Sequence, residues 1–449
     1  MLRTPQTPPL ETWIGRKIGL ADGHIPGRAD LERYQLKALN RTLARVRQRS
    51  LFYRKKLRDL PSAPLPDLEA LAGLPFTTAE EVARDPLALL CVSQGCIARA
   101  VTLTTSGTTG PPKRFLFTPG DLELTLDFFH HGMATLVAPG QRVLILLPGK
   151  APCSVGDLLV KALARMDVQG VLMDPETAPE RVLAALRKTP VHSVVGTPLQ
   201  LLALVRGPAD PLPRGQIRTV LLSTDYVPRA ICTALEESWG CRVFQHYGMT
   251  EMGYGGAVDC GFRRAYHLRE GDLLFEVVDP QTGDPLPAGR AGEVVFSTLT
   301  HEGMPLLRYR TGDLAVMPPE PCACGSVLGS LGHVQGRLNN RAVLGNGAIL
   351  EMAALDEALF SLPEVVSFTA ELKEAAGQDH LRLTLYALDA PAGTRESAVQ
   401  SALGKIDALG TALASGELQI APLQWHPAAS SSLRPVKRQL MDQRTGRYA

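Results

Sequence analysis

The sequence predicts an α/β protein. A large N-terminal domain would contain parallel βαβ units and a β-rich subdomain, and a small α/β domain would follow at the C-terminus. Between residues 142 and 248, short apolar runs alternate with segments of helical spacing, the pattern of parallel strands joined by helices. The last ~110 residues mix strand-like and helical segments on the scale of a small domain. A length of 449 residues leaves room for both domains.

The composition is that of a globular protein, with 45% of residues hydrophobic and 20% charged. A formal net charge of +2 gives no reason to expect binding to nucleic acid or to a membrane surface. Residues 1–20 lack the apolar core of a signal peptide, and no run approaches the ~18 apolar residues of a membrane-spanning helix. Eight cysteines in a chain of this length do not indicate a disulfide framework. A cytoplasmic protein is therefore expected.

The predicted elements follow the apolar pattern in chain order. Helical spacing runs through residues 30–60, and the proline-rich residues 61–80 are expected to form a loop. Strands of the parallel sheet are expected at Arg142–Leu147, Gln169–Met173, His192–Val195, Thr219–Leu222 and Arg242–His246. Helices between them are expected at Asp157–Met166, Pro179–Arg187, Leu199–Val205 and Pro228–Trp239. The small domain is expected to contain strands at Val365–Leu372, Arg382–Ala387 and Leu418–Pro422, and a helix at Glu396–Leu413.

A loop rich in glycine and hydroxyl groups lies between two β-prone runs, Val101–Leu103 and Phe115–Phe117. It reads TTSGTTGPPK from Thr104 to Lys113. Its glycines let the backbone approach a ligand, and its turn amides, hydroxyls and lysine are suited to phosphate oxygens. The order of a Walker A loop is absent. The residues favour a flexible polyphosphate-binding loop, with an ordinary Gly/Thr hairpin turn as the alternative.

Polar residues also follow two of the predicted strands, at the edge of the sheet where ligands bind. These are Ser223-Thr224-Asp225 and the pentapeptide Tyr247–Glu251, YGMTE. A hydroxyl beside a carboxylate can bind a nucleotide phosphate and a magnesium ion. Further on, Asp313 in LRYRTGDL follows a glycine, a position from which Asp can accept both ribose hydroxyls. The structural alternatives are turn and helix-cap chemistry, and a strand–turn with an exposed Asp.

Four soft or borderline metal ligands occur in a second set of residues: Cys260, His267, Cys322 and Cys324. Together they are the number and type that tetrahedral zinc requires. A closed site with four protein ligands would be structural, and it would join the loop after YGMTE to the loop after RTGD. Inert cysteines and a surface histidine are the alternative.

Three motifs, in order, resemble those of the adenylate-forming superfamily, which includes acyl-CoA synthetases, peptide-synthetase adenylation domains and luciferases. They are TSGTTGPPK, YGMTE and RYRTGD. The helix-then-proline opening and VVFSTLTHEGMPLLRYRTGD are similar to the phenylacetate–CoA ligase branch, whose members often carry the cysteines and histidine named above. The resemblance implies that ATP adenylates a carboxylic acid, aryl or arylacetic in this branch, and that CoA then forms the thioester.

The resemblance also implies domains and residue roles. It implies an AMP-binding domain at residues 1–335, a hinge at 336–340 and a mobile lid domain at 341–449. The expected catalytic residues are Lys437 as the charge partner of the attacking carboxylate, Glu251 as the Mg²⁺ ligand, and Lys113. Nucleotide contacts are expected from Thr105, Ser106, Gly107, Thr108, Thr109, Gly110, Lys113, Ser223, Thr224, Asp225, Tyr247, Gly248, Thr250, Asp313 and Arg337. Among these, Thr250 would contact the α-phosphate and Asp313 the ribose.

Three departures from the family pattern keep alternatives open. Asn339 and Asn340 replace two acids at the hinge, where asparagine tolerates unusual dihedral angles. Residues 343–351 lack the Arg and Pro that border the thioester tunnel, so a carrier protein or cofactor hydroxyl is an alternative acceptor. No glycine precedes Lys437, which leaves a solvated tail and a non-catalytic nucleotide-binding partner protein as alternatives. A homodimer is expected only from relatives.

Overall fold

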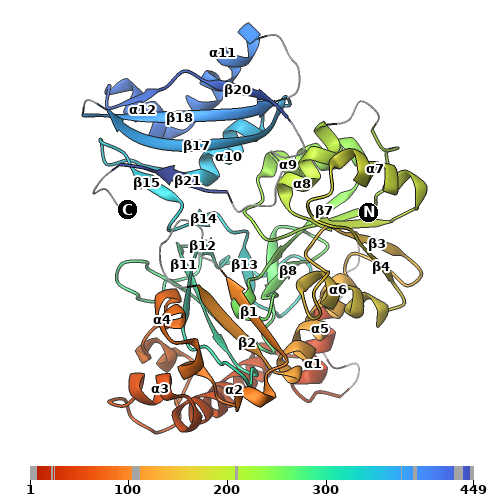
Figure 1. Ribbon diagram of the computed structural model, residues 1–449. Helices are drawn as coiled ribbons and strands as arrows, with labels where there is room; N and C mark the ends of the chain where they lie inside the picture. The colour runs from red at the N-terminus through yellow and green to blue at the C-terminus, as the bar shows by residue number, and fades with distance from the viewer. Residues whose placement is uncertain are drawn as a thin grey trace. The chain divides into compact units, whose positions relative to one another are not determined.

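The structure is a computed structural model that describes residues 8–21, 24, 26–103, 112–207, 211–375, 377–387, 392–428 and 438–444. The chain divides into two units. The first comprises residues 1–140, 150–168 and 244–334, and the second comprises residues 141–149, 169–243 and 335–449. Both units mix helices with sheets, which confirms the predicted α/β class (Figure 1). The boundaries of the lid and hinge stay a prediction.

Most helices of the first unit lie in its N-terminal part. Its α-helices are α1 Pro9–Lys17, α2 Arg28–Arg49, α3 Leu51–Lys56, α4 Ala79–Arg84, α5 Pro119–Met133 and α6 Val155–Ala164. Its 3₁₀ turns are η1 Glu69–Gly73, η2 Pro86–Leu89, η3 Gln94–Cys96 and η4 Thr250–Met252. The helical spacing predicted through residues 30–60 corresponds to two helices, because Ser50 between them is extended and its side chain caps α3 by accepting a hydrogen bond from the Tyr53 amide. The loop predicted at 61–80 is interrupted by η1 and by the start of α4.

Antiparallel strands make up the sheets of the first unit. Strands β1 Arg99–Leu103 and β2 Lys113–Phe117 are the two strands predicted on either side of the glycine-rich loop, and they pair antiparallel with Leu103 opposite Lys113. A second sheet joins β10 Leu273–Val278, β11 Ala291–Thr298 and β12 Tyr309–Val316. A third set joins the end of β7 Arg242–Tyr247 to β8 Ala257–Asp259, β9 Ala265–Leu268 and β13 Ser330–Gly332. These strands form the predicted β-rich part of the protein.

The second unit contains the predicted parallel sheet. Its strands pair in the order β6 Thr219–Leu222, β5 Ser193–Gly196, β3 Arg142–Ile145 and β4 Gln169–Leu172. The connecting helices in this unit are α7 Pro179–Lys188, α8 Pro198–Arg206 and α9 Arg229–Trp239. All residues of β5 and β6 are buried, as expected for strands covered on both faces. The alternating apolar pattern therefore placed these elements correctly.

The C-terminal part of the second unit is organised around a long antiparallel pair, β17 Val365–Ala375 and β18 Gln378–Ala387. The other elements are β14 Gly336–Arg337, β15 Arg341–Val343, β16 Ile349–Glu351, α10 Met352–Phe360, α11 Ala392–Leu403, α12 Asp407–Ala414, β19 Leu418–Ile420, β20 Gln424–Pro427 and β21 Leu440–Asp442. The helix predicted at Glu396–Leu413 is two helices, since the chain turns at Gly404 and is extended at Ile406. Strand β21 pairs in parallel with β17 and was not predicted.

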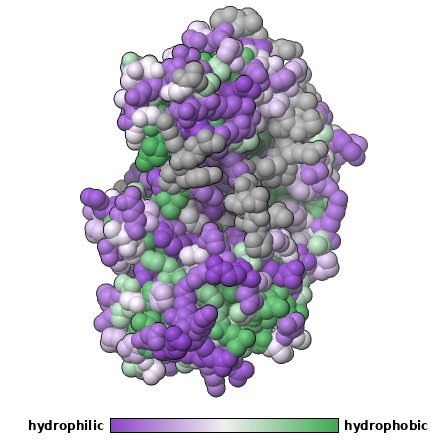
Figure 2. All heavy atoms as spheres, turned by 60° about the vertical axis from the view of Figure 1, so that its left-hand side comes forward, coloured by the Kyte–Doolittle hydropathy of each residue, from purple (hydrophilic) through white to green (hydrophobic). Residues whose placement is uncertain are grey.

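The face drawn in Figure 2 is mostly hydrophilic, with apolar patches interspersed. Large apolar side chains that are exposed, such as Leu51, Leu172 and Phe262, are far apart in the sequence. No helix among the described residues is long and apolar enough to cross a membrane.

Candidate active site

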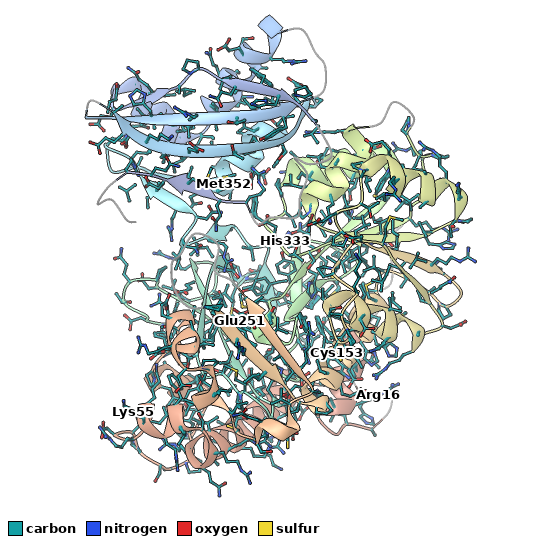
Figure 3. All side chains as sticks on the ribbon, in the orientation of Figure 1. Arg16, Lys55, Cys153, Glu251, His333 and Met352 are labelled. Carbon is teal, nitrogen blue, oxygen red and sulfur yellow. The ribbon has the colours of Figure 1, made fainter. Side chains whose placement is uncertain are left out.

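Lys113 and Glu251, which are 138 residues apart in the sequence, form an ion pair in the first unit. Lys113 Nζ lies 2.7 Å from Glu251 Oε1, and only 4% of the glutamate side chain is exposed. Figure 3 marks the position of Glu251. The pairing arises because Lys113 begins β2 directly after the glycine-rich loop, while Glu251 lies in the turn η4 that follows β7. The hydroxyl of Tyr309 donates a second hydrogen bond to the same Oε1 atom, at 3.2 Å. Two of the three predicted motifs therefore meet through their charged residues.

The third motif joins this site through strand β12. Side chains along β12 alternate between buried and half-buried, so Tyr309, Thr311 and Asp313 share its buried face. Tyr309 thus reaches Glu251, while Asp313 Oδ2 accepts a hydrogen bond of 3.0 Å from the hydroxyl of Tyr247. Sequence reasoning missed Tyr309, although the alternation within RYRTGDL was the signal that could have identified it.

The backbone around YGMTE is tightly packed. A Cβ atom at Gly248 would lie 2.3 Å from the carbonyl oxygen of Tyr254, so only glycine fits there. Thr250 begins η4 and is half-buried. Gly253 ends the turn with φ of 68°, in the left-handed region that glycine favours. This turn fixes the direction in which the Glu251 side chain leaves the backbone.

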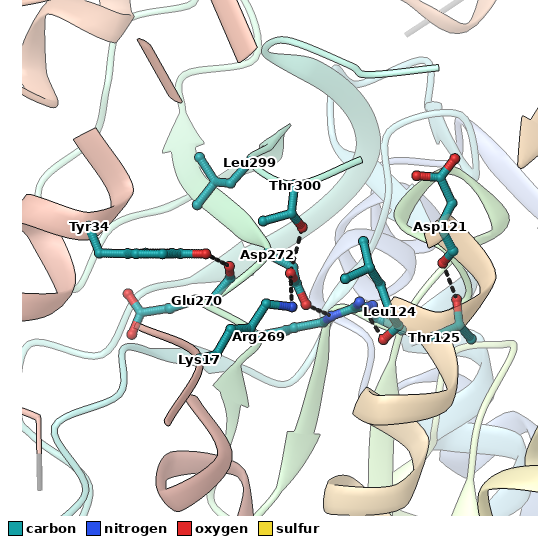
Figure 4. Close-up of polar contacts among 12 residues, drawn as sticks. Lys17, Tyr34, Asp121, Leu124, Thr125, Arg269, Glu270, Asp272, Leu299 and Thr300 are labelled. Carbon is teal, nitrogen blue, oxygen red and sulfur yellow. Dashed lines mark hydrogen bonds and ion pairs between the residues drawn. The ribbon is translucent and has the colours of Figure 1, made fainter. Parts of the chain in front are cut away.

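A buried ionic network holds the segment after Glu251 against helix α5 (Figure 4). The guanidinium of Arg269 donates to the carbonyl oxygens of Gly255, at 3.1 Å, and Leu124, at 2.6 Å. Its Nε donates to Asp272, which also forms an ion pair with Lys17. Burial alone would raise the pKa of Asp272, but the charges of Arg269 and Lys17 lower it to about 2. Sequence reasoning missed this network, which needs tertiary contacts to be recognised.

The other predicted nucleotide contacts lie either in the second unit or outside the described residues, so their place at the site stays a prediction. Ser223, Thr224, Asp225 and Arg337 belong to the second unit, where Ser223 is buried and Thr224 has φ of 77°. Asp225 Oδ2 accepts a hydrogen bond of 3.2 Å from the amide of Arg438. The loop residues Thr105, Ser106, Gly107, Thr108, Thr109 and Gly110, together with Lys437, lie outside the described residues.

The predicted metal ligands come together in the first unit. The ligand atoms of Cys260, His267, Cys322 and Cys324 all lie within 4.8 Å of one another. Cys260 Sγ is 3.7 Å from Cys322 Sγ, and His267 Nε2 is 3.2 Å from Cys324 Sγ. Zn–S bonds of ~2.3 Å in a tetrahedron place two sulfurs ~3.8 Å apart. The donor set and the sulfur–sulfur spacing therefore fit a four-coordinate zinc ion.

His246 directly precedes the YGMTE motif in the sequence. The centroid of its imidazole ring lies 5.9 Å from the ring centroid of Phe128 and 6.3 Å from that of Phe129. Burial lowers the pKa of His246 to about 4, so the ring stays neutral at physiological pH. In the unfolded chain the pKa returns to ~6.5, and acid therefore favours unfolding as the pH falls from ~6.5 to ~4.

We expect His246 to account for roughly 3 kcal/mol of the free energy of unfolding that is lost in acid, because that is the energy of lowering its pKa from ~6.5 to about 4. Urea titrations at pH 7 and pH 4 check this. The wild-type free energy of unfolding should fall by roughly 3 kcal/mol more than that of His246→Asn over this interval. Equal falls in both proteins would show that His246 does not titrate this way.

Residues 98–300 match the family model described as AMP-binding enzyme. The chain is 31% identical over 358 residues to the phenylacetate-coenzyme A ligase of Thermus thermophilus, covering 76% of this chain and 77% of that protein. It is 26% identical to the Pseudomonas putida protein of the same name, covering 70% and 72% of the two chains. The solved structure of a 2-hydroxyisobutyryl-CoA ligase in complex with 2-HIB-AMP has the same fold, with a TM-score of 0.77 and a sequence identity of 17%. The match covers 96% of this chain and 97% of that chain.

The family model and the curated relatives identify the chain as an adenylate-forming enzyme. Within that class, its sequence identity to these relatives and the share of each chain that is covered identify the family. The chain belongs to the phenylacetate–CoA ligase family, as its motifs predicted.

Proposed function

We propose that this protein activates a carboxylic acid with ATP and transfers the acyl group to the thiol of CoA. A carboxylate oxygen attacks the α-phosphorus, the bond to the β-phosphate breaks, and acyl-AMP and pyrophosphate form. The CoA thiolate then attacks the acyl carbon and AMP leaves. The observation that carries this proposal is the 2.7 Å ion pair between the half-buried Lys113 and the buried Glu251, which connects the end of the predicted phosphate loop to the YGMTE motif.

The residues at this site support a role in positioning and charge neutralisation, which dominate the catalysis of phosphorus transfer. Lys113 offers a cation to phosphate oxygens, and Asp313 offers a carboxylate to the ribose hydroxyls. Glu251 provides a hard oxygen ligand for Mg²⁺, and among the described residues no hydrogen bond falls on its Oε2 atom. When bound, Mg²⁺ would neutralise charge on the triphosphate. Thr250 would contact the α-phosphate, and Tyr247 would lie near adenine.

Other parts of the proposal rest on the family resemblance. Residues 105–110 would hold the phosphates, Ser223–Asp225 would lie on the adenine side, and Lys437 would stabilise the attacking carboxylate. Residues 341–449 would act as a mobile lid that rotates at 336–340, where Arg337 would contact the nucleotide. The acid would be aryl or arylacetic, in keeping with relatives called phenylacetate-coenzyme A ligases. Zinc at Cys260, His267, Cys322 and Cys324 would be structural.

Two further proposals concern the state of the protein in the cell. A cytoplasmic location is supported by eight free cysteines. A homodimer is proposed only from the resemblance to relatives.

ATP–pyrophosphate exchange tests the proposed function directly. With a panel that includes phenylacetate, benzoate and short aliphatic acids, exchange should depend on one aromatic class of acid and on Mg²⁺. Adding CoA should then release AMP and give the acyl-CoA. Exchange without CoA-dependent release of AMP would indicate another acceptor, such as a carrier protein. Absence of exchange with every acid would contradict the proposal.

A further inference from the structure

Residues 41–58 carry a concentrated positive charge. They include eight lysines and arginines and no aspartate or glutamate, although the whole chain has 47 basic and 45 acidic residues. The rest of the chain is therefore acidic overall, and the formal net charge of +2 conceals an uneven distribution. The segment comprises the second half of helix α2 and all of helix α3, which belong to the first unit.

Four of the eight basic side chains have partners within the first unit. Three lie beside a carboxylate, in the pairs Lys56–Glu81, Arg58–Asp59 and Arg45–Glu302. The fourth, Arg47, donates hydrogen bonds to two backbone carbonyl oxygens. The other four are exposed and form no ion pair or side-chain hydrogen bond among the described residues: Arg41, Arg49, Arg54 and Lys55. Their charges are therefore available to an external partner.

An exposed leucine lies among these available charges. Leu51 begins α3 and is 62% exposed, the largest value among the exposed large apolar side chains of the described residues. Arg54 and Lys55 follow it at positions i+3 and i+4, so the three side chains share one face of the helix. Tyr53, on the other face, is fully buried. Lys55 projects outward from α3 (Figure 3).

A second exposed leucine, Leu87, lies close to this face of α3. The turn η2 that carries Leu87 packs against α3, and the hydroxyl of Ser50 donates a hydrogen bond of 2.9 Å to the carbonyl oxygen of Ala88. Leu87 is 45% exposed. Arg49 directly precedes Ser50, so it approaches the same turn. The basic patch is defined by Arg49, Leu51, Arg54, Lys55 and Leu87.

An anionic lipid bilayer matches the basic patch in both charge and polarity. Basic side chains bind the headgroups of such a bilayer while apolar side chains beside them enter the boundary of the acyl chains. A protein partner matches less well, because the energetic centres of protein interfaces are rich in Trp and Tyr and poor in Leu. Nucleic acid would match the charges but would leave the two leucines in water.

We propose that the basic patch attaches the protein reversibly to the surface of anionic membranes. Each basic residue close to such a surface favours binding by a factor of about five, so the charges supply most of the affinity. Leu51 and Leu87 add to it by leaving water. Because the charges are exposed, salt should weaken the attachment. Attachment of this kind does not depend on the reaction that the protein catalyses.

Co-sedimentation of the full chain with lipid vesicles tests this proposal. Wild type should bind phosphatidylcholine vesicles that contain about 30% phosphatidylserine, in ~0.1 M NaCl. Vesicles of phosphatidylcholine alone should bind at least about tenfold more weakly, and ~0.5 M NaCl should release the protein from the anionic vesicles.

Charge reversal within the basic patch should weaken binding strongly. Arg54→Glu/Lys55→Glu should lower the partition coefficient by more than about 25-fold, because two attractive charges, each a factor of about five, become repulsive. Arg187→Glu/Lys188→Glu is the matched control, since these are also adjacent exposed basic residues at the end of a helix, α7. This control changes the net charge equally and should bind within about twofold of wild type.

A polar substitution tests the apolar part of the patch separately. Leu51→Ser should lower the partition coefficient by about tenfold, whereas Leu172→Ser, at a leucine that is 41% exposed on strand β4 of the second unit, should leave it within about twofold of wild type. Thermal melting establishes that each variant is folded. Should the charge-reversal variant fail to fold, Arg54→Gln/Lys55→Gln removes both charges without reversing them and should lower binding by about 25-fold.

Several results would overturn the proposal. One is absence of wild-type binding to the anionic vesicles in ~0.1 M NaCl. Another is equal binding by the two charge-reversal variants, which would show that only the net charge matters. Unchanged binding of Leu51→Ser would show attraction between charges without contact of the patch with the bilayer. Binding to an oligonucleotide or to an acidic protein, with no binding to vesicles, would assign the patch to a different partner.

Discussion

Replacing Glu251 with glutamine should lower acid-dependent pyrophosphate exchange by about 1000-fold. The substitution keeps the shape of the side chain and an acceptor for Tyr309, but it removes the charge that pairs with Lys113 and would bind Mg²⁺. Loss of preorganised charge at a phosphoryl-transfer site is among the most costly single changes in an enzyme. Measuring exchange with saturating ATP, acid and Mg²⁺ checks the expected loss, and thermal melting establishes that the variant is folded.

Glu270→Gln provides the matched control. Glu270 is also a buried, ion-paired carboxylate of the first unit, where it contacts Arg28 at 2.8 Å and lies outside the Lys113–Glu251 pair. Its replacement should leave exchange within a few-fold of wild type at a temperature where the protein is folded. A Glu251→Gln enzyme that retained exchange within tenfold of wild type would contradict the role given to this carboxylate.

Cys322→Ser should remove bound zinc and destabilise the first unit. The cysteine ligands lie in the connection from β12 to β13 and at the end of β8, and His267 lies on β9, so the metal would join segments that are distant in the sequence. Loss of a structural zinc ion should cost on the order of 3–5 kcal/mol, because metal binding is coupled to folding. Zinc content by mass spectrometry and thermal melting check both effects.

A buried cysteine outside the metal cluster is the control for this experiment. Cys91 is 3% exposed and is not one of the four clustered ligands, so Cys91→Ser should keep one zinc ion per chain. Wild-type protein purified without chelator should also contain one zinc ion per chain. A zinc content near zero in that preparation would show that the cluster is not a zinc site.

Sequence patterns identified best the elements whose burial follows from the local order of apolar and polar residues. Strands β3, β5 and β6 follow from runs of apolar residues, because parallel strands buried on both faces need side chains of that kind. Strand β4, at the edge of the sheet, is partly exposed although its apolar run also identified it. Helix ends were less predictable. The break at Ser50 and the division at Gly404 depend on one cap or turn residue within an otherwise continuous helical pattern.

The candidate site shows a similar division between local and tertiary information. Glycine, hydroxyl and carboxylate residues in a fixed order pointed to Lys113, Glu251 and Asp313, since each motif is a short contiguous segment. The contacts between motifs, in which Tyr309 bonds Glu251 and Tyr247 bonds Asp313, depend on the placement of β12 beside η4 and β7. The side-chain hydrogen bonds of Asn340 to Arg438 and Leu440 were equally hidden, because these partners lie about 100 residues away in the sequence.

A crystal structure of the protein with ATP and Mn²⁺ tests most directly whether the grouped motifs form an adenylation site. Anomalous scattering should place Mn²⁺ at the carboxylate of Glu251, with triphosphate oxygens near Lys113 and both ribose hydroxyls on Asp313. Nucleotide bound elsewhere, with Glu251 still paired to Lys113 and no metal beside it, would contradict the account.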